Sequence, residues 1–182
     1  MVIHKPAGIL TVPGKTEDLQ DCMINRLVKL EPKTLLIHRL DRDTSGILVF
    51  GLSRWGQKSI SRQFQERQTD KTYQAIVAGH LDGQGTVDVP VIYDPSRPPL
   101  HIAEPSHNKP AVTEWKSVEH FEIRGQPVTR VVLTPITGRS HQLRVHMQFL
   151  GHPIVGDTLY AAPDQQDLMP RLCLHAERLS FH

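Results

Sequence analysis

Hydrophobic residues fall into short runs and helical stripes, which together predict several strands and a few helices. Two runs, at residues 35–37 and 47–50, are short, and the second is rich in β-branched and aromatic types. Residues 94–110 are rich in Pro, His and Ser, which predicts a long loop or an irregular hairpin. Further strands are predicted at residues 2–4, 71–78, 85–92, 112–118 and 128–134, and from residue 172 onward.

Three segments are predicted to be helices. The first runs from Asp18 to Leu30, with charged residues opposite its apolar stripe. The second is capped by Ser53 and runs to about Arg67. The third starts at residues 137–140 and ends at Leu150, before a glycine. Because the helices do not alternate strictly with the strands, the pattern predicts an α+β fold with a mixed, mainly antiparallel sheet and flanking helices.

Composition limits the class of protein. The 182 residues are 38% apolar and 22% charged, which fits a single globular domain over residues 1–182. No apolar run approaches the length of a membrane span, and the N-terminus lacks a signal-peptide pattern. Cys22 and Cys173 fit no metal or redox spacing, so we interpret them as reduced thiols of a cytoplasmic protein. The net charge of +2 permits a polyanionic partner without requiring one.

A polar stretch at residues 38–46, HRLDRDTSG, lies between the two short apolar runs. Charged groups between core strands need partners and hydrogen bonds, or their pKa values shift. Preorganised charge of this kind is what a catalytic site requires. An ordinary loop remains the alternative, because Asp, Thr, Ser and Gly are common in turns.

Three familiar motif assignments fail. A kinase catalytic loop would need a glycine-rich phosphate loop and a later Asp-Phe-Gly, and neither is present. An aspartic-protease turn would have one residue fewer and a second copy. His141 and His146 are five apart, whereas two ligands on one helix face are four apart. We therefore expect no metal site.

Asp41 and Arg144 form the remaining candidate pair. A carboxylate acts as nucleophile or base in a closed pocket only if a partner keeps it ionised there. An arginine from a separate helix is the usual partner, and each residue lies at the end of a predicted element.

A basic stripe is predicted on the second helix. Arg54, Lys58 and Arg62 follow one another at i, i+4 spacing. A solvated helix face is the commoner explanation, and a ridge that contacts phosphates is the alternative.

The stretch at residues 38–46 closely resembles the signature of the RluA family of pseudouridine synthases. The resemblance continues in the same order along nearly the whole chain, so chance is improbable. The other matching motifs lie at residues 5–8, 71–73, 109–113, 137–146, 151–157 and 174–176.

The resemblance implies roles for individual residues. Asp41 would be the essential catalytic aspartate and Arg144 its ion-pair partner. Tyr73 would stack on the target uracil and is a candidate base for the final proton removal. Arg39 would fill the space that the flipped nucleotide leaves in the RNA, and Leu174 would line the apolar pocket. Arg139 and His141 are further candidate RNA-binding residues.

The family also implies the reaction. A pseudouridine synthase, an isomerase, converts uridine to pseudouridine in structured RNA without a cofactor. The compact form most resembles members that modify large-subunit (23S-type) ribosomal RNA and also a tRNA anticodon stem-loop. We expect a monomer with no membrane partner. Family members typically have a strand before the Lys5-Pro6 motif and residues after the last strand, so we expect a chain trimmed at both ends, without an N-terminal RNA-binding domain.

Two rival functions can be distinguished. A catalytically silent RNA-binding or folding module would have no need of Asp41, Tyr73 and Arg144 together. A hydrolase could use Asp41 and Asp43 as a carboxylate pair on a glycosidic bond, and its product would be free uracil.

Overall fold

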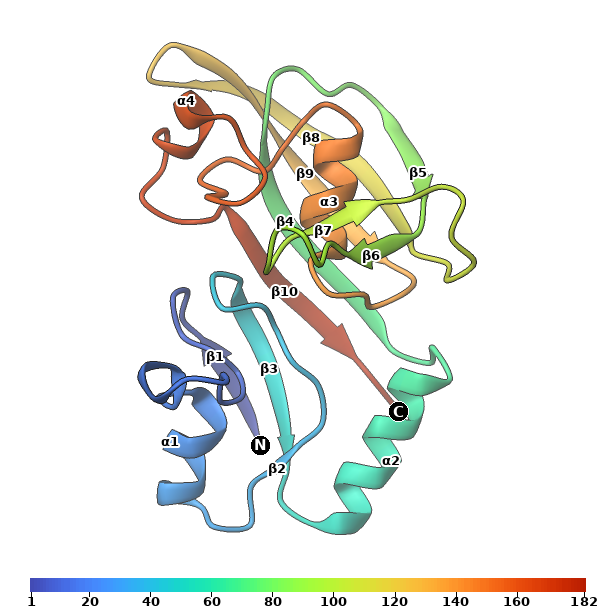
Figure 1. Cartoon of the computed structure of the whole chain (residues 1–182). Coiled ribbons are helices and arrows are strands. Elements are labelled where there is room, and N and C mark those ends of the chain that lie inside the picture. Colours follow the sequence, from blue (N-terminus) through green and yellow to red (C-terminus); the bar gives the residue numbers. More distant parts are fainter. The chain divides into compact units, whose positions relative to one another are not determined.

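The computed structural model describes residues 1–182, and Figure 1 shows the course of the chain. It contains two compact units. The first consists of residues 1–71 and 175–182, and the second of residues 72–174. The expectation of a single catalytic domain stays a prediction.

The first unit is built around β3 (Ser45–Gly51), which is buried along most of its length. Two short strands, β1 (Val2–Lys5) and β2 (Leu35–Leu36), pair with it in antiparallel fashion. The last strand, β10 (Leu174–Ser180), pairs with it in parallel. The two apolar runs on either side of the polar stretch are therefore strands, as predicted, although β2 is only two half-buried residues long.

The first helix of this unit starts later than predicted. A 3-10 turn, η1 (Glu17–Leu19), precedes α1 (Met23–Leu30). The backbone N–H groups of Met23 and Ile24 donate to the carbonyls of Leu10 and Thr11. These contacts with a distant segment fix where the helix begins, and a local periodicity cannot show them.

The second helix, α2 (Arg54–Gln65), agrees with its prediction. The Ser53 side chain accepts a hydrogen bond from the N–H of Gly56 at 3.1 Å, which is the expected cap. The helix ends two residues before the predicted end, since Arg67 has a positive φ of 58°.

The second unit holds an antiparallel sheet in the order β4, β9, β8, β5. Its members are β4 (Asp70–Ala78, whose first two residues belong to the first unit), β5 (Gln84–Asp88), β8 (Val112–Ile123) and β9 (Gln126–Pro135). The strand predicted at 85–92 is broken before β6 (Val91–Tyr93), at Pro90, because proline cannot donate a hydrogen bond to a neighbouring strand. The segment predicted as a loop or irregular hairpin contains β7 (His101–Ala103), which pairs with β6.

Helix α3 (Gln142–Phe149) packs on one face of this sheet. Its Leu143 and Met147 side chains are buried in one core cluster with Val131 and Leu133 of β9. The helix starts at Gln142 rather than at residues 137–140, because His141 has a left-handed φ of 55°. A short helix, α4 (Pro163–Gln166), was not predicted.

The predicted fold class is confirmed: the chain is α+β, and its sheet is mixed. Antiparallel pairs join β1 and β2 with β3, β4 and β8 with β9, and β5 with β8, and a parallel pair joins β10 with β3. None of the helices is long and apolar enough to cross a membrane.

Candidate active site

The first unit presents Asp41 on an irregular segment, residues 37–44, between β2 and β3. Asp41 is half-buried, and the Leu40 side chain next to it is buried in the core. The carboxylate is therefore carried by a loop whose neighbouring residue is anchored.

Two buried polar side chains fix the backbone on either side of Asp41. Thr11 Oγ1 donates to the Leu40 carbonyl at 2.8 Å and accepts from the Leu40 N–H at 3.2 Å. Lys5 Nζ donates to the carbonyls of Arg42, at 2.8 Å, and of Pro6 and Ile9. The backbone on both sides of Asp41 is thus held by hydrogen bonds from Thr11 and Lys5, two residues far away in the sequence.

Lys5 is a buried cation close to the acidic loop. Its side chain is fully buried, and burial lowers its pKa to about 8, against the opposing effect of the Asp43 and Asp41 carboxylates. The three carbonyl acceptors replace the water that burial removes. The ammonium group, charged at neutral pH, places positive potential beside the candidate catalytic carboxylate.

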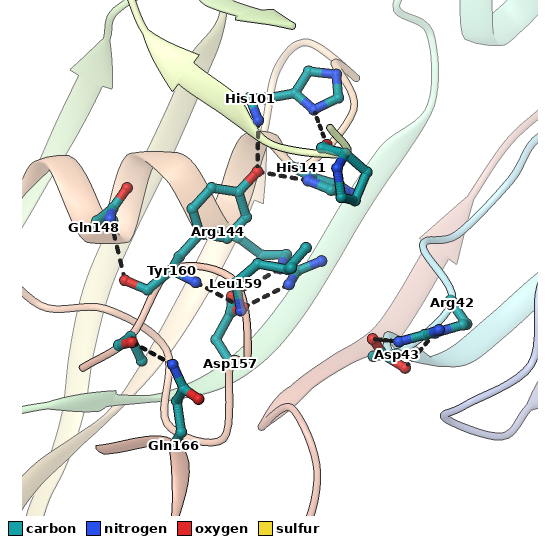
Figure 2. Close-up of polar contacts among 12 residues, drawn as sticks. Arg42, Asp43, His101, His141, Arg144, Gln148, Asp157, Leu159, Tyr160 and Gln166 are labelled. Atoms are coloured by element: carbon teal, nitrogen blue, oxygen red, sulfur yellow. Dashed lines mark hydrogen bonds and ion pairs between the residues drawn. The ribbon is translucent and has the colours of Figure 1, made fainter. Parts of the chain in front are cut away.

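Asp43 has a partner of its own. The Arg42 guanidinium donates to both of its carboxylate oxygens, at 3.1 and 3.2 Å (Figure 2). The engagement of Asp43 by Arg42 argues against the Asp41–Asp43 pair that a glycosidic hydrolase would use.

Arg39 is exposed, as a residue that enters RNA would need to be.

Just after the loop, β3 passes unusually close to β10. A Cβ atom on Gly46 would lie 2.2 Å from the carbonyl oxygen of Ala176, and Gly46 has a φ of 122°. Only glycine fits this position. Beside it, Ser45 Oγ and His175 Nδ1 are 2.8 Å apart, so the loop leads into a closely packed strand pair.

His38, at the start of the motif, has a structural role. Its Nε2 accepts a hydrogen bond from the N–H of Val49 at 3.0 Å, and its ring stacks on Phe64. Burial, and to a lesser extent the charge of Lys71, lower the pKa of His38 to about 4. The imidazole is therefore neutral at physiological pH and anchors the motif to β3.

The second unit positions Arg144 on α3. Its Nε and Nη2 atoms donate to the two carboxylate oxygens of Asp157 at 2.7 and 2.5 Å, and both side chains are almost fully buried (Figure 2). Asp157 also accepts from the N–H groups of Leu159 and Tyr160. This bidentate pair fixes the plane of the guanidinium group.

Tyr160 adds a second constraint on Arg144. Its ring centroid lies 5.0 Å from the guanidinium carbon. Its hydroxyl is 2.6 Å from His141 Nδ1 and accepts from the N–H of His101 at 2.9 Å (Figure 2). Arg144 is therefore held by a carboxylate and an aromatic ring that are themselves hydrogen-bonded.

Asp157 and Tyr160 were not among the predicted site residues. Asp157 was visible as the end of the motif at residues 151–157, but nothing in that motif indicates that it faces α3. The pairing of Arg144 with Asp41 stays a prediction, because those two residues belong to different units.

Tyr73 and Leu174 both contact the hydrophobic core of the second unit. Tyr73 lies on β4 opposite Leu133 and is half-buried against the core cluster. Leu174 is buried in the same cluster, with 3% of its surface exposed. Their roles toward uracil stay predictions.

The predicted RNA-binding residues differ in their surroundings. Arg54, Lys58 and Arg62 are exposed on α2. Arg139 is also exposed, and its Nε donates to the Pro110 carbonyl at 3.2 Å. His141 is half-buried and hydrogen-bonded to Tyr160, so it helps to position Arg144.

His146, on α3 of the second unit, is fully engaged in hydrogen bonds. Both ring nitrogens of His146 have partners, Thr113 Oγ1 and the Val89 carbonyl, each at 2.9 Å. Burial lowers the pKa of His146, so the ring is neutral at physiological pH. No group of three or more His, Cys, Asp and Glu side chains is arranged to hold a metal ion.

Comparisons with known proteins agree with the resemblance in the sequence. The family model described as "RNA pseudouridylate synthase" matches residues 1–149. The "Dual-specificity RNA pseudouridine synthase RluA" of Escherichia coli (strain K12) is 46% identical over 183 aligned residues, which cover 100% of this chain and 82% of the relative. The protein of the same name from Vibrio vulnificus (strain CMCP6) is 43% identical, covering 100% of this chain and 74% of the relative.

A solved structure has the same fold. "Human RNA Pseudouridylate Synthase Domain Containing 1" superposes with a TM-score of 0.84 at 33% identity. The match covers 98% of this chain and 73% of the human chain.

Proposed function

The chain belongs to the RNA pseudouridylate synthase family and is an isomerase of that class; we propose that it acts on uridines in structured RNA, in large-subunit (23S-type) ribosomal RNA and in a tRNA anticodon stem-loop. The observation that carries the proposal is 46% identity, over the full length of the chain, to a relative named as a dual-specificity enzyme. The anchored Asp41 loop supports it, because it supplies the fixed carboxylate that the reaction needs.

The reaction exchanges one bond of the target uridine for another. The bond from C1′ to N1 of uracil breaks, the base turns, and a bond from C1′ to C5 forms. The C5 proton leaves and N1 gains a proton, so the product is an isomer and no cofactor is consumed. A catalyst must hold the detached base and move one proton.

Asp41 is the residue that acts on the sugar in this proposal. Its carboxylate either attacks C1′ or removes a sugar proton on the way to a glycal, and both routes need an ionised group in a fixed position. The hydrogen bonds that hold Leu40 and Arg42 supply that position.

Arg144 and Tyr73 complete the proposed site. Arg144 would pair with Asp41, and Asp157 and Tyr160 would keep its guanidinium group aligned. Tyr73 would stack on the uracil and, as a base, accept the C5 proton after the new bond forms. Leu174 would close the apolar side of the pocket.

The target uridine must leave its stack before any of this chemistry can begin. Extruding a base costs a few kcal/mol, and the cost is lower if the protein fills the vacancy. Arg39 is suited to that role, because a planar guanidinium both stacks and contacts phosphate.

The remaining RNA contacts would come from exposed cations. Arg139, with His141 close by in the chain, and the stripe of Arg54, Lys58 and Arg62 would contact the backbone of the RNA. We further propose that the protein acts as a cytoplasmic monomer with no membrane partner. A silent RNA-binding module of the same fold is the second candidate, and activity separates the two.

Tritium release tests the proposal. Transcripts of ribosomal RNA and of a tRNA anticodon stem-loop, each labelled at uracil C5, are incubated with the protein and with Asp41→Asn. Release by the wild type and none by the variant would support pseudouridine formation through Asp41. RNA binding by the wild type without release from either transcript would favour the silent module.

A further inference from the structure

Trp55, at the start of α2, is exposed over 82% of its surface. Tryptophan is usually among the more buried residues, because its large ring gains much from leaving water. The ring of Trp55 takes part in none of the aromatic or cation–π contacts of the structure. Folding therefore does not explain why the indole of Trp55 is exposed to solvent.

The packing of α2 does not depend on Trp55. The opposite side of the helix makes the contacts: Gln57 Nε2 donates to the Leu36 carbonyl, and the Gln63 amide bonds to the backbone of His182. Phe64 stacks on His38. Trp55 lies on the outer side, so the helix would stay in place without it.

The outer side of α2 forms a shallow groove of about 590 Å³. Its lining combines the Trp55 indole with two cations, Lys58 and Arg62, at i+3 and i+7 on the same side of the helix. Neither cation forms an ion pair or a hydrogen bond within the protein. The other lining residues are Ser59, Ser61 and Gln65, so no acidic side chain lines the groove.

A flat aromatic ring beside unpaired cations matches the chemistry of a nucleotide. Any nucleobase can stack on an aromatic ring, so such a contact does not depend on the RNA sequence. The phosphates beside the stacked base attract positively charged side chains. Lys58 and Arg62 lie within roughly 10 Å of Trp55 along the helix, close enough to serve the same short stretch of backbone.

A protein partner would fit this groove less well. Tryptophan and arginine are frequent at protein interfaces, but such interfaces have an apolar core. Here serine, glutamine and two cations surround a single aromatic ring.

We propose that Trp55 stacks on an unpaired nucleobase of the bound RNA, outside the proposed catalytic site, while Lys58 and Arg62 contact the phosphates beside it. The proposal rests on the proposed function only for the identity of the partner as RNA. It makes the outer side of α2 a second contact with the substrate, one that prefers single-stranded over paired nucleotides.

Tryptophan fluorescence can follow this contact directly. The only other tryptophan is Trp115, so the difference in emission between the wild type and Trp55→Phe reports on Trp55. Each protein is titrated with the anticodon stem-loop transcript and, separately, with heparin, a polyanion without bases. We expect RNA to quench the Trp55 emission and to shield it from acrylamide, and heparin to bind without quenching it.

Affinity gives an independent measurement that does not require turnover. Trp55→Ala should raise the Kd for the stem-loop roughly 5- to 100-fold, as is typical when one base-stacking aromatic ring is lost, and leave its salt dependence nearly unchanged. Replacing Arg54, Lys58 and Arg62 together with Gln should also weaken binding and flatten the slope of log K against log salt by about 2 to 3. Thermal melting checks that each variant folds.

Three outcomes would overturn the proposal. One is an equal Kd for Trp55→Ala and the wild type. Another is Trp55 emission that RNA leaves unchanged. The third is emission that changes with protein concentration before RNA is added, which would make this side of α2 a contact between two copies of the chain. Each result is independent of pseudouridine formation, so failure of the proposed activity would be seen separately.

Discussion

At the scale of single residues, the best-defined feature is the immobilised guanidinium group of Arg144. Its bidentate partner, Asp157, has no exposed surface, and the Tyr160 ring lies beside the pair. Breaking a buried pair by removing one partner is costly, because the other charge is left uncompensated. Loss of stability and loss of function must therefore be separated in any test of Arg144.

A double variant separates them. Arg144→Met and Asp157→Asn should each lower the free energy of unfolding, by about 3 to 5 kcal/mol, measured by urea denaturation. Combining the two changes removes both charges and should recover part of that loss. Turnover should stay abolished in the combined variant while RNA is still bound. Turnover that returns together with stability would contradict a role for Arg144 in the reaction.

His38 makes stability depend on pH. Its pKa is about 4 in the folded protein against 6.5 in the unfolded chain, so between these values the unfolded chain binds a proton that the folded protein does not. Stability is therefore lost as pH falls from 6.5 toward 4. From pH 7 to pH 5 this group should cost about 2 kcal/mol.

The variant His38→Gln provides the comparison, because its amide oxygen can still accept from the N–H of Val49 but does not titrate. Urea unfolding at pH 7 and pH 5 should show a smaller loss of stability for the variant than for the wild type. Equal losses in the two proteins would mean that His38 is not the group responsible.

At the scale of elements, the segment that carries Asp41 is fixed by side chains from another part of the chain. Thr11 holds Leu40, and Lys5 holds Arg42. A site on a loop is held less precisely than one on a strand, so the hydrogen bonds on both sides of Asp41 are what fix its backbone.

Replacing Thr11 with Val tests this arrangement, since the shape is kept and both hydrogen bonds to Leu40 are lost. We expect a loss of about 1 to 3 kcal/mol in stability and a fall in kcat of roughly 10- to 100-fold, with little change in the Kd for RNA. Thr34→Val is the matched control, because Thr34 is equally buried but bonds to Glu31, away from this loop. Equal effects of the two changes on kcat would contradict a positioning role for Thr11.

Local patterns in the sequence were sufficient for most of the elements. The apolar runs predicted β3, β8 and β9, and Ser53 predicted the start of α2. The late start of α1 could not be predicted, because it depends on carbonyls of Leu10 and Thr11. The local periodicity of apolar residues carries no information about long-range contacts of this kind.

The same reason explains what was missed in the site. The motifs identified the Asp41 loop and Arg144 but not the side chains that hold them. Lys5 lies in the motif at residues 5–8, but it donates to the carbonyl of Arg42, 37 residues away. Asp157 lies in the motif at residues 151–157, but it accepts from Arg144, 13 residues away. A polar residue that becomes buried shows its role only when its partners are known.

At the scale of the whole molecule, charge is nearly balanced. The chain has 21 Lys and Arg against 19 Asp and Glu, so its net charge alone gives little attraction to RNA. Binding must therefore depend on where the cations are concentrated, such as the outer side of α2, and on aromatic and shape contacts.

Nucleoside analysis measures whether the chain isomerises uridine through Asp41. The RNA is incubated with the wild type or with Asp41→Asn, digested to nucleosides and separated by liquid chromatography with mass detection. With the wild type, we expect uridine to be lost and pseudouridine, of the same mass, to appear in equal amount; with the variant, we expect neither change. Free uracil released from the RNA in place of pseudouridine would rule out isomerisation and identify a hydrolase.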